Sequence, residues 1–366
     1  MKVLLISPFG RQLKGGIAAW TGHIMSYYEQ HPVDNFELKL LYNPNSKATF
    51  ANTSFFRRIY NGICSYFPLY RSFVKTIKQE DFDVVHVCTS ASISLIKDLA
   101  IIRLAHKRHI KTVVHCHFGR IPDIFSGDNW EKQLFKRLLT VTDRLVVMDQ
   151  KSYDCIVQYG YPNVKYVPNP LTESVQQVIL ENPTIPRVSN KILFVGHVVQ
   201  TKGVVELVEA CSQLKGIDLF LIGPIPEKDI EKQIVEIGEK ISNNWLHLTG
   251  PMSIEQVIKE MLSCSVFALP TYTEGFPYVI VESMACGCAI VTTPVGAIPE
   301  MLNINGNRKC GICVEPKNVE QLKDAIQYLL NNKEEAIRMG KCAEERVREQ
   351  YAMPIVWGKL LDVWMN

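Results

Sequence analysis

Two glutamates eight residues apart have residue types and a spacing that could do chemistry. Glu274 precedes the sequence Gly-Phe-Pro, and Glu282 lies in the apolar run that follows it. Glutamate is seldom fully buried without a partner. Vicinal hydroxyl groups, such as those of a ribose, can donate hydrogen bonds to a carboxylate. The pair therefore predicts a ligand rich in hydroxyl groups, with a ribose at Glu282 and a sugar near Glu274.

Two turns of the same half predict a site for an anion. Pro277 favours the first turn of a helix, so that the free N–H groups near Gly275, Phe276 and Tyr278 would face a phosphate. Upstream, a predicted strand runs into Gly196, where the backbone can approach a ligand closely. Lys202 then adds a positive charge near another helix start. Together these features predict a diphosphate between the ribose and the sugar.

The first half of the chain offers a glycine pair and a histidine pair. Gly15 and Gly16 follow the predicted first strand, where backbone N–H groups could meet a phosphate or an acceptor; a plain turn is the equal alternative. His115 and His117 are two residues apart on the predicted strand Thr112–His117, so they share one face. They could be a metal pair, but no acidic third ligand is evident nearby, and we expect no metal.

Short apolar runs that alternate with longer amphipathic stretches must position these residues. The alternation indicates βαβ units, and therefore an α/β protein with two parallel sheets covered by helices. Ligands of such sheets bind beyond the carboxyl ends of the strands. The predicted strands are Lys2–Ser7, Phe36–Tyr42, Val84–Cys88, Thr112–His117, Arg144–Met148, Lys191–Val195, Asp218–Ile222, Leu246–Thr249, Val266–Leu269 and Ala289–Thr293. Helical periodicity is clearest in Gly203–Leu214, Ile254–Leu262 and Val319–Leu330.

The length of 366 residues favours two domains, because one ordinary core does not grow that large. We expect an N-terminal domain over residues 1–168 and a C-terminal domain over residues 169–345. The proline-rich stretch Val167–Arg187 is the predicted linker. Residues 346–366 are predicted to form a C-terminal helix that packs back towards the N-terminal domain.

Charge is divided unevenly along the chain. Residues 1–180 contain 22 Lys and Arg against 14 Asp and Glu, a net charge of +8; residues 181–366 contain 18 against 23, a net charge of −5, and the sum is +3. Residues 55–79 have five basic side chains, several aromatic ones and no acidic one. This segment could lie on an anionic membrane or pack partly in the core. No nucleic-acid motif accompanies it, so nucleic acid is not an expected partner.

The cysteines and the apolar runs indicate a compartment. Eleven cysteines without a disulfide framework or a zinc-site spacing favour a reducing environment. The N-terminal apolar run is too short for a signal peptide, and no run reaches the length of a membrane span. We expect a cytoplasmic protein, or one bound peripherally to the inner face of the cytoplasmic membrane.

Taken in order, these motifs resemble the family 4 retaining glycosyltransferases. The specific part of the resemblance is Glu274-x7-Glu282 with its Gly-Phe-Pro, and the resemblance covers nearly the whole chain. It implies two Rossmann-like domains with parallel sheets that face each other across a cleft, the arrangement called GT-B. The other matching segments are Gly15-Gly16, Pro168-Asn-Pro170, Phe194-Val-Gly196, Lys202-Gly203, Ala285-Cys-Gly287 and Val295-Gly-Ala-Ile-Pro-Glu300.

The resemblance also implies roles for individual residues. The N-terminal domain would lie on the acceptor side, and the C-terminal domain would hold a nucleotide-sugar donor. No metal or other cofactor is implied. The implied catalytic residues are His117, Glu274 and Lys202, and the implied donor-binding residues are Gly15, Gly16, Gly196, His197, Lys202, Glu274, Gly275, Phe276, Pro277 and Glu282.

One residue departs from the family pattern. The family usually has an arginine after the Phe-Val-Gly strand, where this chain has His197. A neutral imidazole offers one hydrogen-bond donor where a guanidinium offers five. Lys202 and the helix N-terminus must then carry more of the diphosphate's charge, or His197 is protonated in the complex.

The function implied is that of a retaining hexosyltransferase in cell-surface polysaccharide biosynthesis. It would move a hexosyl group from a UDP- or GDP-sugar to a hydroxyl group of a glycan or a lipid-linked acceptor. Three alternatives remain open: a glycosidase using the two glutamates, a nucleotide-sugar epimerase, and a nucleotide-sugar-binding protein without transferase activity in a polysaccharide assembly complex. The phosphate-binding features would have no purpose in a glycosidase.

Overall fold

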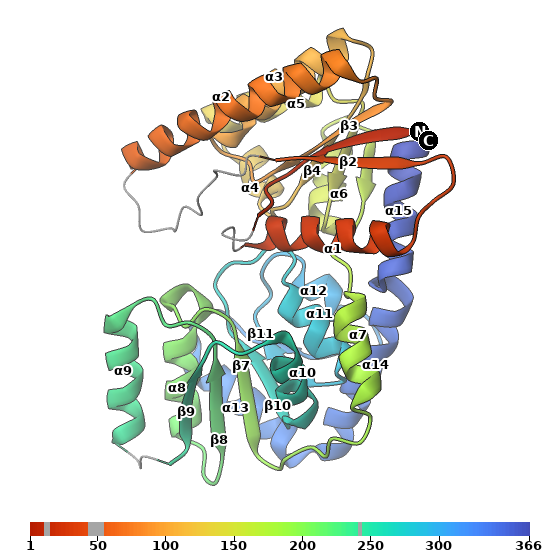
Figure 1. The fold of residues 1–366 in the computed structure, drawn as a ribbon. Coiled ribbons are helices and arrows are strands. Elements are labelled where there is room, and N and C mark those ends of the chain that lie inside the picture. Colours follow the sequence, from red (N-terminus) through yellow and green to blue (C-terminus); the bar gives the residue numbers. More distant parts are fainter. Residues whose placement is uncertain (11–14, 43–54, 241–243) are drawn as a thin grey trace. The chain divides into compact units, whose positions relative to one another are not determined.

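Two six-stranded parallel sheets, each flanked by helices, are the framework of the protein (Figure 1). This arrangement confirms the predicted α/β class. The computed structural model describes residues 1–10, 15–42, 55–240 and 244–366, with the backbone alone for residues 55–66.

The chain forms two compact units. The first unit consists of residues 1–169 and 356–366, and the second unit consists of residues 170–355. The chain therefore passes between the units twice. The C-terminal segment that belongs with the first unit begins at Val356, whereas residues 346–355 belong with the second.

The first unit has the strand order β2-β1-β3-β4-β5-β6, with all neighbours parallel. Its chain order runs from β1 to β2 on one side and then to β3 on the other. Its elements are β1 (Lys2–Ile6), α1 (Gly16–Gln30), β2 (Glu37–Leu41), α2 (Phe55–Gln79), β3 (Val84–Thr89), α3 (Ser94–Lys107), β4 (Lys111–Cys116), α4 (Ile121–Ser126), α5 (Trp130–Leu139), β5 (Arg144–Val147), α6 (Gln150–Gln158), β6 (Val164–Tyr166) and most of α15 (Met353–Met365).

The second unit has the strand order β12-β11-β10-β7-β8-β9. The chain runs from β7 outward to β9 and then crosses back to place β10 on the other side of β7. Its elements are α7 (Glu173–Glu181), β7 (Lys191–Val195), the 3-10 turn η1 (Gln200–Lys202), α8 (Val204–Ser212), β8 (Asp218–Ile222), α9 (Lys228–Glu239), β9 (Leu246–Gly250), α10 (Ile254–Ser263), β10 (Val266–Leu269), α11 (Tyr278–Ala285), β11 (Ala289–Thr292), α12 (Ile298–Met301), β12 (Ile312–Cys313), α13 (Val319–Asn331) and α14 (Lys333–Gln350).

Buried apolar strands form the centre of each unit. In β10, for example, Val266, Phe267, Ala268 and Leu269 are all buried. Such runs are typical of parallel strands, whose two faces are both covered by helices. The fold therefore leaves the loops at the carboxyl ends of the strands as the places where polar side chains can gather.

The predicted linker Val167–Arg187 is not an irregular segment. It contains α7, which is capped by Thr172: the side-chain oxygen of Thr172 accepts a hydrogen bond from the N–H of Val175 at 3.3 Å. Val175 is buried and anchors the helix. The prolines that suggested a linker flank this helix and do not interrupt it. Among the described helices, none is both long enough and apolar enough to cross a membrane.

Candidate active site

The carboxyl edge of the second sheet brings together most of the residues predicted to bind a donor. Lys202 follows β7, and Glu274 follows β10, its parallel neighbour. The strand order reverses between these two strands. Ligands of doubly wound sheets bind outside the carboxyl ends of the strands at such a switch point. The topology therefore places Lys202 and Glu274 where a ligand is expected.

Lys202 and Glu274 form an ion pair between Nζ and Oε1. The lysine side chain is 26% exposed and the glutamate side chain 14% exposed, so both reach the surface without being fully solvated. A pair in such a partly buried position is screened less than one in open solvent. The ion pair thus keeps both charged groups together at the carboxyl edge of the sheet.

Tyr272 ties the loop after β10 to the loop after β7. Its hydroxyl group donates to a carboxylate oxygen of Glu206, the side-chain amide of Gln200 donates to it at 3.0 Å, and its backbone N–H donates to the carbonyl of Thr201 at 2.9 Å. Burial and the bond to Glu206 raise the pKa of Tyr272 to about 12, so it remains a donor. Sequence reasoning missed this residue because its partners are about 70 positions away, at separations of 66, 71 and 72 residues.

Gly296, in the loop after β11, supports Glu274 from a third strand. It has φ of 54°, and a Cβ atom there would lie 2.3 Å from the carbonyl oxygen of Glu274. The N–H of Ala297 donates to the carbonyl of Gly275 at 2.9 Å. Only glycine permits this close approach of the two loops. The backbone that carries Glu274 is therefore held by a residue 22 positions later.

Glu282 lies inside α11, as predicted. It is half-buried, and burial raises the pKa of its carboxyl group to about 7. No hydrogen bond or ion pair reaches this carboxylate from the described residues. A ligand that donates hydrogen bonds would lower the cost of its charge.

The remaining predicted donor-binding residues of this unit lie in the same loops. Gly196 follows β7 with φ of 152°, and His197 after it is exposed. Phe276 is buried and packs edge-on against Tyr351, with ring centroids 5.5 Å apart. Pro277 is the residue that precedes the first turn of α11.

In the first unit, helix α1 brings the glycine pair close to the histidine pair. Gly15 precedes the helix and Gly16 begins it; both are exposed, with open space where a Cβ would stand. One turn later, Trp20 packs edge-on against His117 with ring centroids 4.9 Å apart. His117 lies just beyond β4, not on it as predicted, and its N–H donates to Thr89 at 3.0 Å. The catalytic role of His117 and the donor binding of Gly15 and Gly16 stay predictions.

His115 belongs to a buried cluster with His86 and Cys88, whose possible ligand atoms lie within 4.8 Å of one another. The indole N–H of Trp364 donates to Nδ1 of His86 at 2.8 Å, so the proton of a neutral His86 is on Nε2. Burial raises the pKa of Cys88 to about 12. A protonated nitrogen and a protonated thiol are poor metal ligands. The chemistry of this donor set favours packing of these side chains over metal binding.

Burial also keeps His115 and His117 neutral. It lowers the pKa of His117 to about 3 and that of His115 well below its ordinary value. His117 can therefore exchange hydrogen bonds with a ligand, but it does not bring a positive charge.

The basic aromatic segment is helix α2. Phe73 and Ile77 are buried, while Arg71, Lys75 and Lys78 line an open groove of about 600 Å³ along the helix. The structure therefore assigns Phe73 and Ile77 to the core, whereas Phe67 is exposed. The predicted roles of residues 55–66 concern side chains outside the described residues.

Comparison with known proteins matches residues 24–346 to two family models. Residues 175–346 match the family model for glycosyl transferases group 1, and residues 24–174 match the model for glycosyltransferase family 4. MMP alpha-(1->4)-mannosyltransferase of Mycolicibacterium hassiacum is 25% identical over 305 residues, which are 78% of this chain and 71% of that protein.

Two further proteins are similar. N,N'-diacetylbacillosaminyl-diphospho-undecaprenol alpha-1,3-N-acetylgalactosaminyltransferase of Campylobacter jejuni is 27% identical over 154 residues, which are 42% of this chain and 39% of that protein. The Anabaena protein HepE, solved in complex with UDP, has a TM-score of 0.72 at 16% identity, with 100% of both chains covered.

Proposed function

Because the chain belongs to the group 1 glycosyltransferases of family 4 and has their GT-B fold, we propose that it is a retaining hexosyltransferase that uses a nucleotide diphosphate sugar. The acceptor is a hydroxyl group of a glycan or a lipid-linked glycan. The observation that carries the proposal is the Lys202–Glu274 pair at the switch point of the second sheet, together with Glu282 in α11, the helix that follows Glu274 in the chain.

The donor occupies the loops at this sheet edge. The diphosphate takes the ammonium group of Lys202 as its partner, and the N-terminus of α11 adds the positive end of a helix dipole. Two hydroxyl groups of the ribose donate hydrogen bonds to the carboxylate of Glu282, and this interaction favours its ionised form. UDP is the first nucleotide to test, since HepE binds it, and GDP is the second.

The reaction exchanges one C–O bond for another at the anomeric carbon. The bond to the diphosphate breaks and its electron pair leaves with the phosphate, while the acceptor oxygen forms the new bond on the same face of the sugar. Lys202 and the helix N-terminus stabilise the negative charge that develops on the leaving group. Glu274 orients the hydroxyl groups of the sugar. The departing phosphate takes the acceptor's proton, so no side chain serves as base and no metal or cofactor is required.

The acceptor is proposed to be anchored to a membrane. The name of the Campylobacter relative specifies an acceptor linked to undecaprenol diphosphate. In this chain, Arg71, Lys75 and Lys78 form an exposed basic row on α2, and the exposed ring of Phe67 lies on the same helix. Basic and aromatic side chains of this kind bind anionic lipid headgroups. We place the protein at the cytoplasmic face of the membrane, where it would build cell-surface polysaccharide.

The function is tested by donor binding followed by turnover. A panel of UDP- and GDP-sugars is screened for a rise in the unfolding temperature of the purified chain, because a ligand that binds the folded state stabilises it. The donor that binds is then incubated with lipid-linked acceptors, and the product's anomeric configuration is read by NMR. Inversion, or the absence of any binding nucleotide sugar, contradicts the proposal.

The alternatives give different results in the same assays. An epimerase converts the donor without an acceptor, a glycosidase cleaves glycans without a nucleotide, and a silent binding protein shows a thermal shift without turnover. Loss of turnover in Glu274→Ala with the thermal shift retained supports the transferase.

A further inference from the structure

Two pairs of cysteines lie close together in the second unit, and one pair borders a cavity. The Sγ atoms of Cys310 and Cys342 are 3.0 Å apart, and those of Cys264 and Cys288 are 3.8 Å apart. Cys310 and Cys342 both line a cavity of about 80 Å³, together with two arginines. A disulfide bond requires a sulfur–sulfur distance of about 2 Å. The first pair therefore needs a movement of only about 1 Å to become bonded.

The approach of Cys310 to Cys342 is set by the backbone around them. Cys310 precedes β12, and its N–H donates to the carbonyl of Leu302 at 2.9 Å. Cys342 lies on α14, which comes so close to a neighbouring loop that a Cβ on Gly340 would lie 2.1 Å from the carbonyl oxygen of Gly287. Neither segment can retreat without breaking these contacts.

Side chains reinforce the same junction. Arg346 on α14 donates to the carbonyl of Glu300 at 2.8 Å and to that of Met301 at 2.9 Å. Arg308 forms an ion pair with Glu345. Residues 300–311 are thus held against α14 by several noncovalent contacts, which keep the two thiols in place before any bond forms.

We propose that Cys310 and Cys342 are a redox modification site: a peroxide converts them to a disulfide that links the segment before β12 to α14, and a dithiol reverses it. In the first step, the sulfur of Cys342 attacks the peroxide O–O bond, giving a sulfenic acid and water. In the second step, the sulfur of Cys310 displaces the sulfenic oxygen, which leaves as water. Two thiols lose two protons and two electrons, and one peroxide accepts them.

The protonation of Cys310 and the accessibility of the two residues decide which thiol reacts first. Burial and the hydrogen bond with Cys342 raise the pKa of Cys310 to about 12. Cys310 is therefore a poor first nucleophile, since the thiolate is the nucleophilic form. It reacts second, and it gives up its proton as it attacks the sulfenic sulfur of Cys342. Cys342, which is 7% exposed where Cys310 is 1% exposed, is also the more accessible residue.

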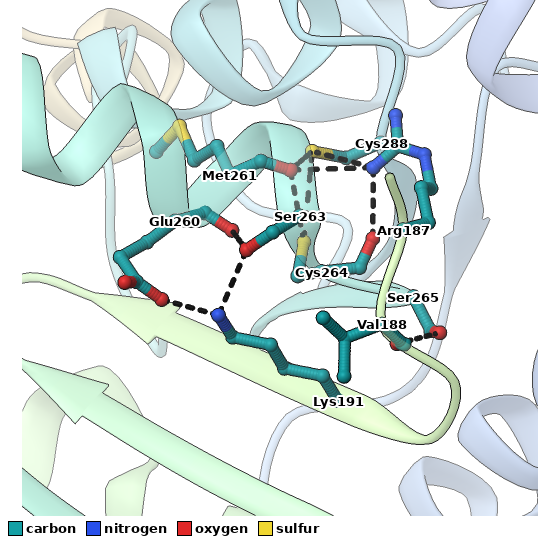
Figure 2. Close-up of polar contacts among 9 residues, drawn as sticks. All are labelled: Arg187, Val188, Lys191, Glu260, Met261, Ser263, Cys264, Ser265 and Cys288. Carbon is teal, nitrogen blue, oxygen red and sulfur yellow. Dashed lines mark hydrogen bonds and ion pairs between the residues drawn. The ribbon is translucent and has the colours of Figure 1, made fainter. Parts of the chain in front are cut away.

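The second pair provides an internal comparison (Figure 2). The guanidinium of Arg187 donates to the carbonyl of Cys264 at 2.8 Å and lies 4.0 Å from the sulfur of Cys288. Both thiols also donate to the carbonyl of Met261 at 3.3 Å. Neither sulfur is exposed. A peroxide has no route to this pair, so proximity alone should not lead to oxidation there.

Peptide mapping distinguishes the two pairs. The folded full-length chain is treated with hydrogen peroxide, quenched with an alkylating agent and digested with trypsin without reduction. Cleavage after Lys309 and Lys341 releases residues 310–317 and 342–346, which we expect to find joined after oxidation and separate after treatment with dithiothreitol. Cys264 and Cys288 lie in one peptide, residues 260–308, and we expect both to be alkylated there once the protein is unfolded.

Variants identify the atoms involved. Residues 310–317 also contain Cys313, so Cys313→Ser must keep the joined peptide and Cys310→Ser must lose it. Cys264→Ser is the matched control and should leave the link unchanged. Free Cys310 and Cys342 after oxidation of the folded protein, or a link that persists in Cys310→Ser, overturns the proposal.

Oxidation should stabilise the second unit without changing nucleotide binding. A bond that closes the loop between residues 310 and 342 restricts the unfolded chain, and we expect the unfolding temperature of the second unit to rise by about 5 °C or more. Cys342→Ser should show no such rise. Because this readout needs no donor or acceptor, its failure would leave the proposed transferase activity untouched.

Discussion

The ion pair between Lys202 and Glu274 sets the chemistry of the candidate site at the scale of single residues. A ligand phosphate must compete with a carboxylate for the ammonium group of Lys202. Glu282, by contrast, has no charged partner among the described residues, and its pKa of about 7 reflects burial. The two glutamates that look alike in the sequence are therefore in different electrostatic states.

Glu274→Gln should separate turnover from binding. The amide has no charge with which to pair with Lys202, and it accepts weaker hydrogen bonds from the sugar hydroxyl groups. We therefore expect turnover to fall about 100- to 1000-fold. Nucleotide affinity, measured by calorimetry, should be retained or increased, because Lys202 loses its competitor. Glu255→Gln, which breaks an exposed pair with Lys259, is the control and should change neither quantity. Equal losses of affinity and turnover would contradict this account.

Glu282→Gln should change the pH dependence of stability. The folded pKa of about 7 lies above the ordinary value of 4.5, so the folded state binds a proton more tightly than the unfolded state. The contribution of Glu282 to the free energy of unfolding is fully present below pH 4.5. It is lost as the pH rises through 7. The loss is on the order of 3 kcal/mol.

The glutamine variant, which carries no charge, should be more stable than the natural protein at pH 8 and equal to it near pH 4.5. Urea unfolding at the two values measures the difference. A variant that is destabilised at both values would show that the carboxylate has a structural partner.

At the scale of elements, the loops after β7, β10 and β11 are linked to one another by direct contacts. Tyr272 joins the first two, and the close contact between Gly296 and the carbonyl of Glu274 joins the last two. The position of Glu274 therefore depends on residues of three strands, none of which needs to contact a ligand. Helix α2, which carries the basic row, belongs to the first unit and is not part of these contacts.

Gly296→Ala tests the contact between the loops. Gly296 and Gly216 both have positive φ, 54° and 67°, but only the former is crowded; nothing lies within 4 Å of a Cβ at Gly216. Gly216→Ala should cost about 1 kcal/mol of backbone strain and keep full activity. Gly296→Ala should cost at least about 2 kcal/mol more and reduce turnover, because the loop of Glu274 must move. If the two substitutions changed stability and turnover equally, the contact between Gly296 and the carbonyl of Glu274 would not be what positions the loop.

The basic row of α2 is tested by liposome flotation. Replacing Arg71, Lys75 and Lys78 with glutamine removes three charges, each contributing about 1 kcal/mol to binding at an anionic surface. We expect binding to vesicles with anionic lipid to fall about 100-fold. The control replaces three exposed basic residues on other helices of the same unit, Arg103, Lys107 and Arg137. A similar loss in the control would indicate a general charge effect and not a role for α2.

At the scale of the whole molecule, the first unit is completed by the last residues of the chain. Trp364 is fully buried, donates to His86, and stacks on Phe36 with ring centroids 5.5 Å apart. The backbone carbonyl of Val363 accepts from Arg144 at 2.9 Å. A sheet formed by residues 2–166 therefore depends on a segment almost 200 positions later.

Trp364→Ala should unfold the first unit at a lower temperature than the second. Loss of a buried tryptophan costs about 3–5 kcal/mol, and it also leaves Nδ1 of His86 without its donor. Calorimetry should resolve two transitions, of which only one moves. Trp130→Ala removes the same side chain from a site that is 56% exposed in the same unit, and we expect it to change the transition by less than about 1 kcal/mol. A shift of both transitions would show that the units unfold together.

The sequence alone was sufficient for the α/β class, the positions of ten strands and the two glutamates. Each of these depends on a local pattern: buried parallel strands are apolar along their whole length, and Glu274 and Glu282 flank one turn. Three features were not predicted: short strands such as β12, the helix α7 between prolines, and the end of β4 before His117. Too few residues carry a strand or helix pattern at these places.

Only the tertiary structure showed which distant residues meet. The pairing of Lys202 with Glu274 follows from the crossover that sets β10 beside β7, and the pKa of Glu282 follows from the packing around α11. The contacts of Tyr272, Gly296 and Trp364 likewise join segments far apart in the chain. Local sequence determines which strands and helices can form, whereas charge pairing, burial and close backbone contact depend on distances that exist only after the chain has folded.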